Sequence, residues 1–293
     1  MKSFRCFFML FFALFALFII AACSNGEGTN SADNARIVSI GPANTEIIVA
    51  LGLSRNIIAT DTFSENVPGI ASGISQIDMM AIDIEHIISL APSIVVATEM
   101  IRFPGAPDPL AAVEALGIEV VFIPVSDSID GIRTDIRQLA SIFDAAAAGE
   151  TIIANMDAEI ASITSALANV SDRRSVYFEL YPPPFMTSFG QGSFLQEVFD
   201  ILNIDNIFAD QGAWVTVADE VVIERNPDVI LTSVDMLPNM EYEIANRPGW
   251  GTISAVQDGN IFVVNADASN RPSHNIVYAI RQIAQLVYPS YFR

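Results

Sequence analysis

Lysine, histidine and cysteine are almost absent from this 293-residue chain. Lys2 is the only lysine, His86 and His274 are the only histidines, and Cys6 and Cys23 are the only cysteines. These numbers exclude zinc-finger spacing and a disulfide scaffold, and we expect neither a bound metal ion nor a cofactor. Basic residues are also few, at 14 against 34 acidic ones, which gives a net charge of -20. Such a charge repels phosphate backbones, so nucleic acid is not expected as a partner.

Motifs that would indicate catalysis are missing as well. The chain has no Gly-x-Ser-x-Gly, no phosphate loop ending in Gly-Lys-Ser/Thr and no His-Glu-x-x-His. Gly190-Gln191-Gly192 precedes a helical pattern but lacks the third glycine of a dinucleotide-binding turn. No nucleophile with a partnered base can be identified, so we expect a protein that is not an enzyme and has no catalytic residues.

The N-terminal segment is typical of a targeting signal. Lys2 and Arg5 precede an uncharged, mostly apolar stretch at 6–22, and Ile20-Ala21-Ala22-Cys23 resembles the lipobox of bacterial lipoproteins. We therefore predict a signal peptide at 1–22, lipidation of Cys23 and a flexible tether at 23–35. The protein would then be extracytoplasmic and lipid-anchored to the cell membrane. The alternative is a plain membrane anchor in which Cys23 has no role.

The remaining pattern predicts an α/β fold built from two similar halves. Short apolar runs bounded by turn residues are typical of strands buried on both faces of a parallel sheet. They occur at 37–40, 94–97, 120–123, 176–178, 229–231 and 261–264. Alanine and isoleucine at helical spacing indicate helices at 129–170, which Gly149 is expected to divide, and a closing helix at 273–287. We place an N-terminal lobe at 36–127, a linking helical segment at 128–172 and a C-terminal lobe at 173–293.

An internal repeat relates the two halves. In each half a glutamate opens a helical stretch and a proline follows seven residues later, immediately before a buried strand. The pairs are Glu85 with Pro92 and Glu220 with Pro227. The proline ends the helix because its ring conflicts with a helical residue before it. Two repeated halves leave a cleft between them, where small ligands commonly bind.

Several residues on predicted loops are candidates for the walls of that cleft. An apolar ring on a loop is unfavourable in water unless something covers it. The rings are Phe63, Phe103, Phe185 and Trp214. Asp267 and Arg271 follow the last predicted strand, at the edge of the sheet where ligands bind in open α/β folds. The alternative is a surface ion pair, which two such residues alone more often form.

The stretch Arg36-Ile37-Val38-Ser39-Ile40-Gly41-Pro42-Ala43-Asn44-Thr45-Glu46 resembles the opening of substrate-binding proteins for iron-siderophore and vitamin B12 ABC importers. The resemblance continues through Ile84-Glu85…Pro92, Glu220…Asn226-Pro227-Asp228, Arg247-Pro248-Gly249-Trp250 and Arg271-Pro272. It implies two Rossmann-like α/β lobes joined by a single long helix, the helical-backbone periplasmic-binding-protein fold. It also implies small lobe movements, a monomer, and an ABC permease with its ATPase as partners.

Within this family the chain is most similar to the cobalamin-binding members. Their ligand-facing positions fall on Ala43, Phe63, Phe185, Trp214, Asp267 and Arg271. Two departures are Met79 and Thr98, which stand where that subgroup has tryptophans. Met79, Met100, Arg102 and Phe103 are candidates for rebuilding that part of the wall. The implied cargo is a metal chelate, cobalamin or another corrinoid, and a ferric siderophore or haem is the alternative within the same class.

The resemblance also assigns one docking carboxylate to each lobe, Glu85 and Glu220. Each would form paired, charge-assisted hydrogen bonds with an arginine of the permease. Alternatively, a glutamate at a helix start merely complements the helix dipole. A different class of function also stays open, a ligand-sensing surface lipoprotein that has no transporter partner.

Overall fold

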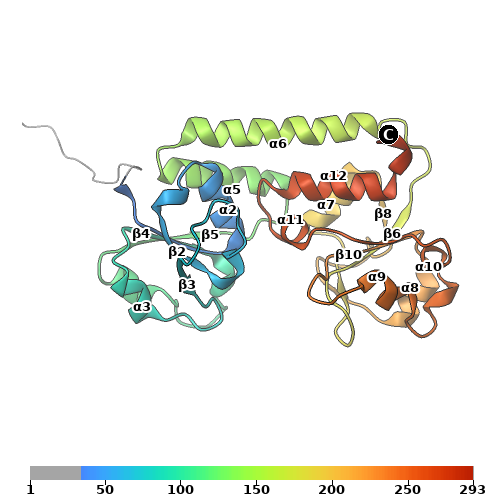
Figure 1. Ribbon diagram of the computed structural model, residues 1–293, viewed down its shortest axis with the longest axis horizontal. Coiled ribbons are helices and arrows are strands. Elements are labelled where there is room, and N and C mark those ends of the chain that lie inside the picture. Colours follow the sequence, from blue (N-terminus) through green and yellow to red (C-terminus); the bar gives the residue numbers. More distant parts are fainter. Residues whose placement is uncertain (1–33, 293) are drawn as a thin grey trace, which may run out of the picture. The chain divides into compact units, whose positions relative to one another are not determined.

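Two parallel β-sheets and a layer of helices make up the fold of the chain (Figure 1). The computed structural model describes residues 34–292, and Ala32–Arg293 form one compact unit. The predicted signal peptide, Cys23 and most of the tether lie outside the described residues. Among residues 34–292, no helix is both long enough and apolar enough to cross a membrane.

The N-terminal lobe is built on a five-stranded sheet with the strand order β3-β2-β1-β4-β5, all parallel. Its strands are β1 (Ile37–Ile40), β2 (Ile57–Asp61), β3 (Ser75–Ile77), β4 (Ile94–Thr98) and β5 (Glu119–Ile123). Its helices are α2 (Pro42–Ala50), α3 (Ile84–Ser89) and α4 (Ala111–Glu114), with the 3-10 turns η2 (Ser54–Asn56), η3 (Thr62–Ser64) and η4 (Glu99–Ile101).

The C-terminal lobe is built on a four-stranded parallel sheet with the order β11-β10-β6-β8, and β7 and β9 form a separate antiparallel pair. The strands are β6 (Ser175–Glu179), β7 (Thr187–Ser188), β8 (Asp205–Asn206), β9 (Val215–Thr216), β10 (Val229–Thr232) and β11 (Ile261–Val263). The helices and 3-10 turns are α7 (Phe194–Ile201), α8 (Asp219–Arg225), α9 (Met240–Ala245), η5 (Trp250–Thr252), α10 (Ser254–Gln257), α11 (Ala266–Asn270), α12 (Ile276–Val287) and η6 (Pro289–Tyr291).

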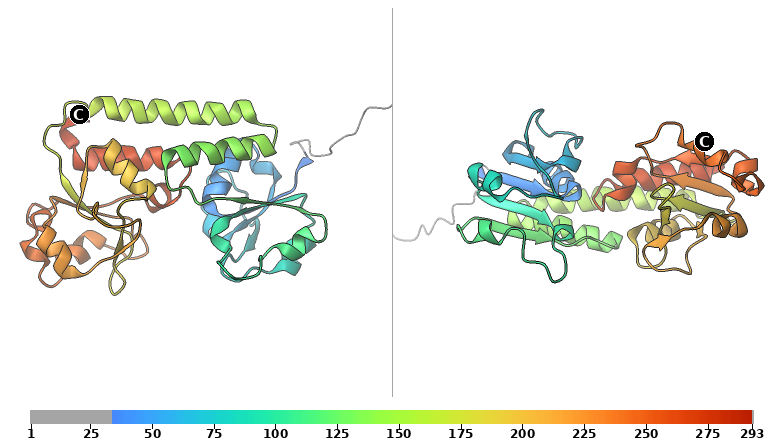
Figure 2. Two further views of the ribbon diagram at one scale, coloured as in Figure 1. Left: turned by 180° about the vertical axis from the view of Figure 1, so that it is seen from behind. Right: turned by 90° about the horizontal axis from the view of Figure 1, so that it is seen from below.

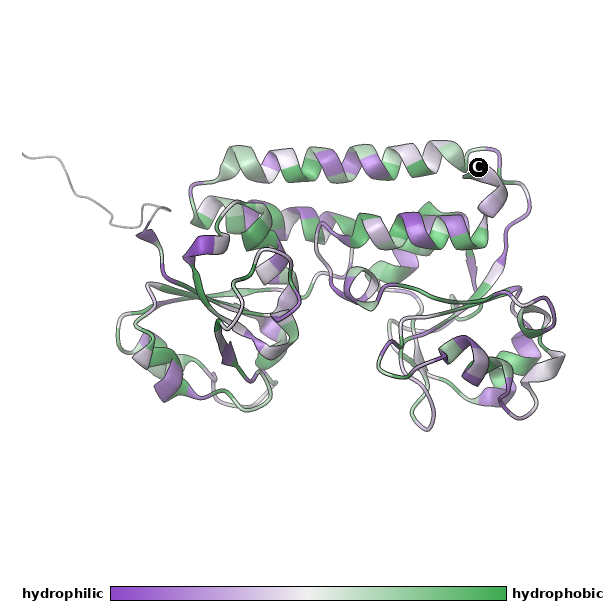
Figure 3. Cartoon of the chain, in the orientation of Figure 1, coloured by the Kyte–Doolittle hydropathy of each residue, from purple (hydrophilic) through white to green (hydrophobic). Residues whose placement is uncertain are grey.

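A long helix joins the two lobes. The segment between the sheets consists of α5 (Ile129–Ile142) and α6 (Ala146–Ala166), and α6 packs along both α5 and α12 (Figure 2). At about 1.5 Å per residue, the 21 residues of α6 extend roughly 30 Å. Both apolar and polar colours alternate along α6, as expected of a helix with one buried side (Figure 3). The fold is therefore the predicted one, with two α/β lobes and one long connecting helix.

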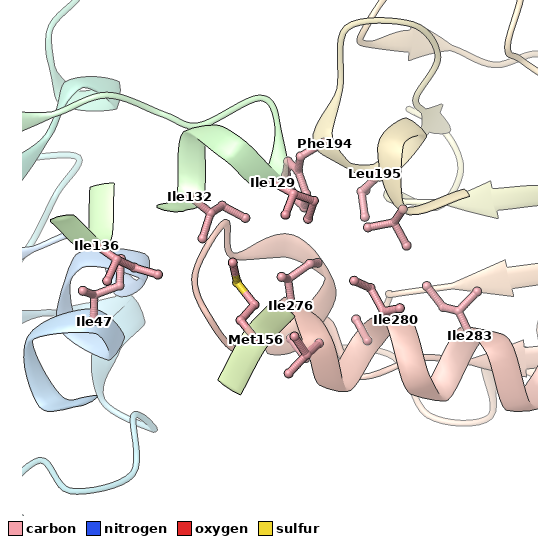
Figure 4. Close-up of a cluster of buried hydrophobic side chains, with 14 of the residues drawn as sticks. Ile47, Ile129, Ile132, Ile136, Met156, Phe194, Leu195, Ile276, Ile280 and Ile283 are labelled. Carbon is pink, nitrogen blue, oxygen red and sulfur yellow. The ribbon is translucent and has the colours of Figure 1, made fainter. Parts of the chain in front are cut away.

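The helical layer shares one hydrophobic core with both sheets. Alternate residues of each buried strand point to opposite faces, so Ile37 belongs to this core and Val38 to another. The same core includes Leu231 of the second sheet and Met156 of α6. Figure 4 shows side chains of α2, α5, α6, α7 and α12 gathered in it. The opposite faces are covered separately, by α3 and α4 in the first lobe and by α8, α9 and α10 in the second.

Each strand predicted from an apolar run is present, with bounds that differ by at most one residue at either end. The strands β2, β3, β7, β8 and β9 were not predicted. β3 has the polar sequence Ser-Gln-Ile, and β7 to β9 have two residues each. Ladder hydrogen bonds hold such strands once a longer neighbour is in place, so a search for apolar runs misses them. β2 is not of this kind: it has five mostly buried residues, and its apolar part is only Ile57-Ile58-Ala59 before Thr60-Asp61. The closing helix begins at Ile276 rather than at 273.

The prediction that Gly149 divides the linking helices is wrong. The break falls at Asp144, which has a left-handed φ of 51°, and Gly149 lies inside α6. The lack of a side chain lets the two helices pack closely, because a Cβ atom at Gly149 would lie 2.6 Å from the Cβ of Ala140 on α5. The glycine is a contact point between two helices and not the end of one.

The internal repeat is present in the backbone. The residue before each proline of the repeat, Ala91 in one half and Asn226 in the other, has a left-handed φ, of 45° and 43°. In both halves the chain therefore leaves the helix in the same way and enters a buried strand, β4 or β10. The predicted boundaries between the lobes stay a prediction, because Ala32–Arg293 form one compact unit with no division inside it.

Replacing Gly149 with alanine is expected to destabilise the protein, although alanine favours helix by about 1 kcal/mol. The added methyl overpacks the contact with Ala140, so the free energy of unfolding measured in urea should fall by about 1–3 kcal/mol. Gly251→Ala is the control, because a Cβ there meets no atom within 4 Å. A stabilised Gly149→Ala variant would show that the two helices do not pack as described.

Candidate functional site

The residues proposed to face a ligand follow the carboxyl ends of the parallel strands. Ala43 comes just after β1, Phe63 after β2, Met79 after β3 and Met100 after β4. In the second lobe Phe185 follows β6, and Asp267 and Arg271 follow β11. Because the carboxyl ends of parallel strands lie along one edge of a sheet, each lobe gathers its candidate residues on one side.

A buried carboxylate shapes the ligand-side loops of the first lobe. Asp61 is fully buried, and it accepts hydrogen bonds from the backbone N–H of Gly41 (2.8 Å), from Phe63 N–H (2.8 Å) and from the Ser64 hydroxyl (2.5 Å). Gly41 has a φ of 114°, and a Cβ atom there would lie 3.0 Å from Thr98, so only glycine fits this turn. The loops after β1 and β2 are thereby fixed to each other, while the ring of Phe63 is left 58% exposed.

The two lobes are joined at the site by a buried glutamate. Glu46 on α2 is 4% exposed and accepts hydrogen bonds from Arg271 Nη1 (2.9 Å), from Asn275 Nδ2 (2.9 Å) and from the hydroxyl of Ser273. The Arg271 guanidinium also donates to the backbone carbonyl of Phe63 (3.0 Å) and pairs with Asp267 (2.6 Å). Charge-assisted bonds of this kind are strong where water is excluded. Arg271 is thus committed to the protein itself.

Three cavities adjoin the segment Asn270–Arg271. The largest, of about 650 Å³, is lined by Glu46, Asp267, Arg271 and His274 among others. A small cavity of about 90 Å³ has walls from the loops after β1, β4 and β5 and from residues 270–272, and Ala43, Met79 and Met100 line it. A third, of about 380 Å³, includes Trp214, Tyr181 and Asn270.

The described residues therefore bring Ala43, Met79, Met100 and Arg271 around one cavity. They place Trp214 at a neighbouring one that shares Asn270 with it.

The antiparallel pair β7-β9 brings two predicted rings of the second lobe onto one small scaffold. Phe185 precedes β7 and Trp214 precedes β9, and Thr187 pairs with Thr216. Both rings are largely exposed, at 77% for Phe185 and 68% for Trp214. The peptide bond between Pro183 and Pro184 in the same loop is cis. Residues 29 positions apart thus present apolar rings from adjacent segments.

Four of the residues predicted to face a ligand line none of the three cavities: Phe63, Phe185, Arg102 and Phe103. Arg102 is held by Glu99 (3.1 Å) and Asp108 (3.3 Å), and its guanidinium lies 4.5 Å from the ring centre of Phe122. Phe103 next to it is 65% exposed. Their role in a ligand wall stays a prediction, and the charge of Arg102 is already balanced within its own loop.

Sequence reasoning missed several residues of the site. Tyr181 lines the cavity that holds Trp214 and is 58% exposed. Asp135 on α5 borders the small cavity, and burial raises the pKa of its carboxyl to about 6 against the opposing effect of the Ser126 hydroxyl. Burial also lowers the pKa of His274. The hydrophobic pattern of α5 gives no hint of Asp135, because a single buried acid among its polar positions has no signature in the sequence.

The proposed docking residues lie on equivalent helices of the two lobes. Glu85 is in the first turn of α3, and Glu220 is in the first turn of α8 (Figure 1). Both side chains are exposed, and both helices cover the sheet face opposite the shared core. Asp83 caps α3 through its carboxylate, which accepts a hydrogen bond from His86 N–H (2.9 Å), so Glu85 itself is free of that task.

Removing the carboxylate of Glu46 is expected to destabilise the protein. Glu46→Ala leaves three buried or half-buried donors without an acceptor, so the free energy of unfolding in urea should fall by about 3 kcal/mol or more. Glu65→Ala, which removes an exposed acid two residues after Phe63, is the control and should change it by less than about 0.5 kcal/mol. Equal effects of the two substitutions would contradict the buried network.

Comparison with known proteins agrees with this architecture. Residues 37–268 match the family model described as "Periplasmic binding protein". The chain is 26% identical over 272 residues to an uncharacterized ABC transporter substrate-binding lipoprotein of Bacillus subtilis, covering 92% of this chain and 85% of that one. It is 28% identical over 283 residues to the vitamin B12-binding protein of Vibrio campbellii, covering 94% and 95%.

A solved structure, the periplasmic heme binding protein HutB of Vibrio cholerae, has the same fold. It aligns with a TM-score of 0.77 at 22% identity over 87% of this chain and 99% of that one. Since the family model spans most of the chain, from β1 into α11, the chain belongs to the periplasmic binding protein family.

Proposed function

We propose that this chain is the substrate-binding lipoprotein of an ABC importer and that it carries a metal chelate, cobalamin or another corrinoid, to the permease and its ATPase. The observation that supports this most is the set of exposed rings on the ligand-side loops of both lobes. Phe63 in one lobe and Phe185 and Trp214 in the other are each more than half exposed. Exposed rings gathered on loops are unfavourable in water unless something covers them.

The way these rings are held favours a flat and rigid cargo. The backbone of Phe63 is fixed on both sides, because Asp61 accepts from its N–H and Arg271 donates to its carbonyl. Trp214 directly precedes β9, whose pairing with β7 holds the backbone next to the ring. A cargo that stacks on preformed rings loses little free energy to ordering the protein. Cobalamin has such a flat ring system, and the haem of the alternative has one too.

The similarities to known proteins support the same assignment, some through the relative's name and some through the fold alone. The Bacillus subtilis relative is named as the substrate-binding lipoprotein of an ABC transporter, and the one from Vibrio campbellii is named for vitamin B12 binding. The haem-binding neighbour shares the fold at lower identity. The Bacillus subtilis relative is named a lipoprotein, which agrees with the predicted lipidation of Cys23 and with an extracytoplasmic, membrane-anchored place of action.

One feature favours haem as the second candidate cargo. Tyr181 is exposed beside Trp214 at the cavity of about 380 Å³, and a tyrosine can serve as an axial ligand of haem iron. The whole chain is strongly acidic, with a net charge of -20, which disfavours a cargo that carries carboxylates. The charge therefore favours a neutral corrinoid over haem.

Purified protein titrated with cyanocobalamin, dicyanocobinamide, haem and a ferric hydroxamate tests the cargo. We expect corrinoid binding, and Trp214→Ala should weaken it by about 1–3 kcal/mol, roughly 5- to 150-fold, because a stacking surface is lost. Tyr242→Ala on α9 is the matched control, since it removes an exposed ring that lines none of the cavities described above.

If the protein binds haem alone, and Tyr181→Phe weakens that binding, haem is the cargo instead of a corrinoid. Binding of none of the four compounds would reject the proposal.

Transport rather than sensing is tested by the docking carboxylates. We expect the double variant Glu85→Ala, Glu220→Ala to bind cargo as the wild type does and to abolish uptake by cells that depend on this protein. The physical reason is that each lobe loses its charge-assisted contact with the permease. The control is Glu114→Ala with Glu224→Ala, which removes two exposed acids of α4 and α8. Normal uptake by the first variant would contradict docking and favour a lipoprotein that senses its ligand.

A further inference from the structure

The small cavity at the ligand side contains a carboxyl group that the proposed function does not yet use. It measures about 90 Å³, the volume of about three water molecules in the liquid. Its walls come from residues 41–44, 98 and 124–125 of the first lobe and from residues 270–272 of the second. A space of this size holds a side arm of a cargo and not its body. Its polar side chains belong to Asn44, Thr98, Asp135, Asn270 and Arg271.

Most of these polar groups are already engaged within the protein. Asn44 donates to the carbonyl of Ile40 (3.3 Å), and the Thr98 hydroxyl accepts from the N–H of Met100 (3.3 Å). The guanidinium of Arg271 donates to Glu46 and to the Phe63 carbonyl and forms an ion pair with Asp267. The side-chain oxygen of Asn270 accepts from Ser269 (3.3 Å).

Asp135 is different because its carboxyl is buried and only half engaged. The residue is 5% exposed, and the Ser126 hydroxyl donates to its Oδ2 at 2.5 Å. Within residues 34–292 this is the one hydrogen bond that the carboxyl makes, and Oδ1 is not among the fully buried unpaired atoms, so it can accept from water or from a ligand. The surroundings of Ser126 are shaped to fit: a Cβ atom on Gly131 would lie 2.8 Å from its Oγ, so the glycine of α5 leaves room for the hydroxyl.

Among residues 34–292, no basic side chain pairs with this carboxyl. Burial is the main cause of its raised pKa, and Ser126 is the only group that opposes it. The charged groups on the elements around it have other partners. Arg271 and Glu46 bind each other, and on α6 Asp157 and Glu150 pair with Arg133 and Arg137. A buried carboxyl without a cation is costly to the fold, and such groups cluster at functional sites.

We propose that Asp135 is a specificity-determining residue, which accepts a hydrogen bond from an N–H or O–H on a side arm of the cargo that enters the small cavity. The protein thereby selects cargo edged with amides over cargo edged with carboxylates. This inference rests on the proposed function, because it concerns the cargo of the same site. A carboxylate arm would meet the like charge of Asp135 in a narrow cavity, whereas an amide arm brings a donor.

Two corrins that share one ring and differ at its edge give the direct test. Cobinamide carries amide arms, and cobyrinic acid carries carboxylates at the same positions. Both are titrated as dicyano forms at pH 7.5. We expect the wild type to prefer cobinamide by at least tenfold and Asp135→Asn to reduce that ratio at least fivefold. Asp127→Asn, which makes the same change of charge at an exposed residue nearby, should leave the ratio within twofold of the wild type.

A pH titration separates ligand recognition from a purely structural role. The carboxyl has a pKa of about 6, so it is ionised at pH 7.5 and protonated at pH 5. An ionised acceptor binds an amide donor more strongly than a neutral one. The affinity of the wild type for dicyanocobinamide should therefore fall at least threefold between pH 7.5 and pH 5, and that of Asp135→Asn should stay flat. If Asp135→Asn does not fold, a flat wild-type profile still overturns the inference.

The outcomes distinguish this inference from the proposed function. A wild type that binds none of the corrins, haem or siderophore fails as a metal-chelate receptor. A wild type that binds cobinamide, but whose selectivity and pH profile are unchanged in Asp135→Asn, keeps the proposed function and overturns the role of Asp135. Preference of the wild type for cobyrinic acid or haem overturns it as well. Asp135→Asn should melt at or above the wild-type temperature at pH 7.5, because it removes a buried charge.

Discussion

A single buried carboxylate, that of Glu46, holds the ligand side of the molecule together. It accepts hydrogen bonds from Arg271, Ser273 and Asn275, which are more than 220 residues away in the sequence and belong to the other lobe. The arginine that it binds also holds the backbone of Phe63. One ionised group therefore sets the spacing of two lobes and the position of one ring at the same time. A charge in this position is stable only because each of its partners is in place, and losing any one of them leaves the others buried and unpaired.

This arrangement limits both the motion of the lobes and the chemistry of the groove. The lobes share a continuous hydrophobic core with α5, α6 and α12, and Glu46 joins them again on the ligand side. Two such connections oppose a wide hinge motion, which agrees with the small lobe movements implied by the family. For the proposed function, a cargo must then fit cavities that already exist on the ligand side. It also follows that Arg271, an expected ligand contact, acts first as a positioning residue, since its guanidinium has three protein partners.

The sequence predicted the architecture because buried parallel strands are apolar runs, and local patterns of that kind survive in any tertiary context. It did not predict every strand that precedes a candidate residue, because Phe63 and Met79 follow β2 and β3. It failed where tertiary contacts decide. Gly149 was expected to end a helix and instead lets α5 approach α6. Short strands such as β3 depend on their neighbours. Glu46, Ser273 and Asn275 form one network only after folding, and no local pattern in the sequence reveals such a network.

The contrast between two buried aspartates shows how the site separates structure from recognition. Asp61 and Asp135 are both buried. Asp61 receives three hydrogen bonds from its own lobe, one of them to Oδ1 and two to Oδ2, so its carboxylate is fully used in fixing the loops after β1 and β2. Asp135 receives one, from Ser126, and faces a cavity between the lobes. The second oxygen of Asp135 has no protein partner among residues 34–292, and in the proposed role its partner is a donor on the cargo.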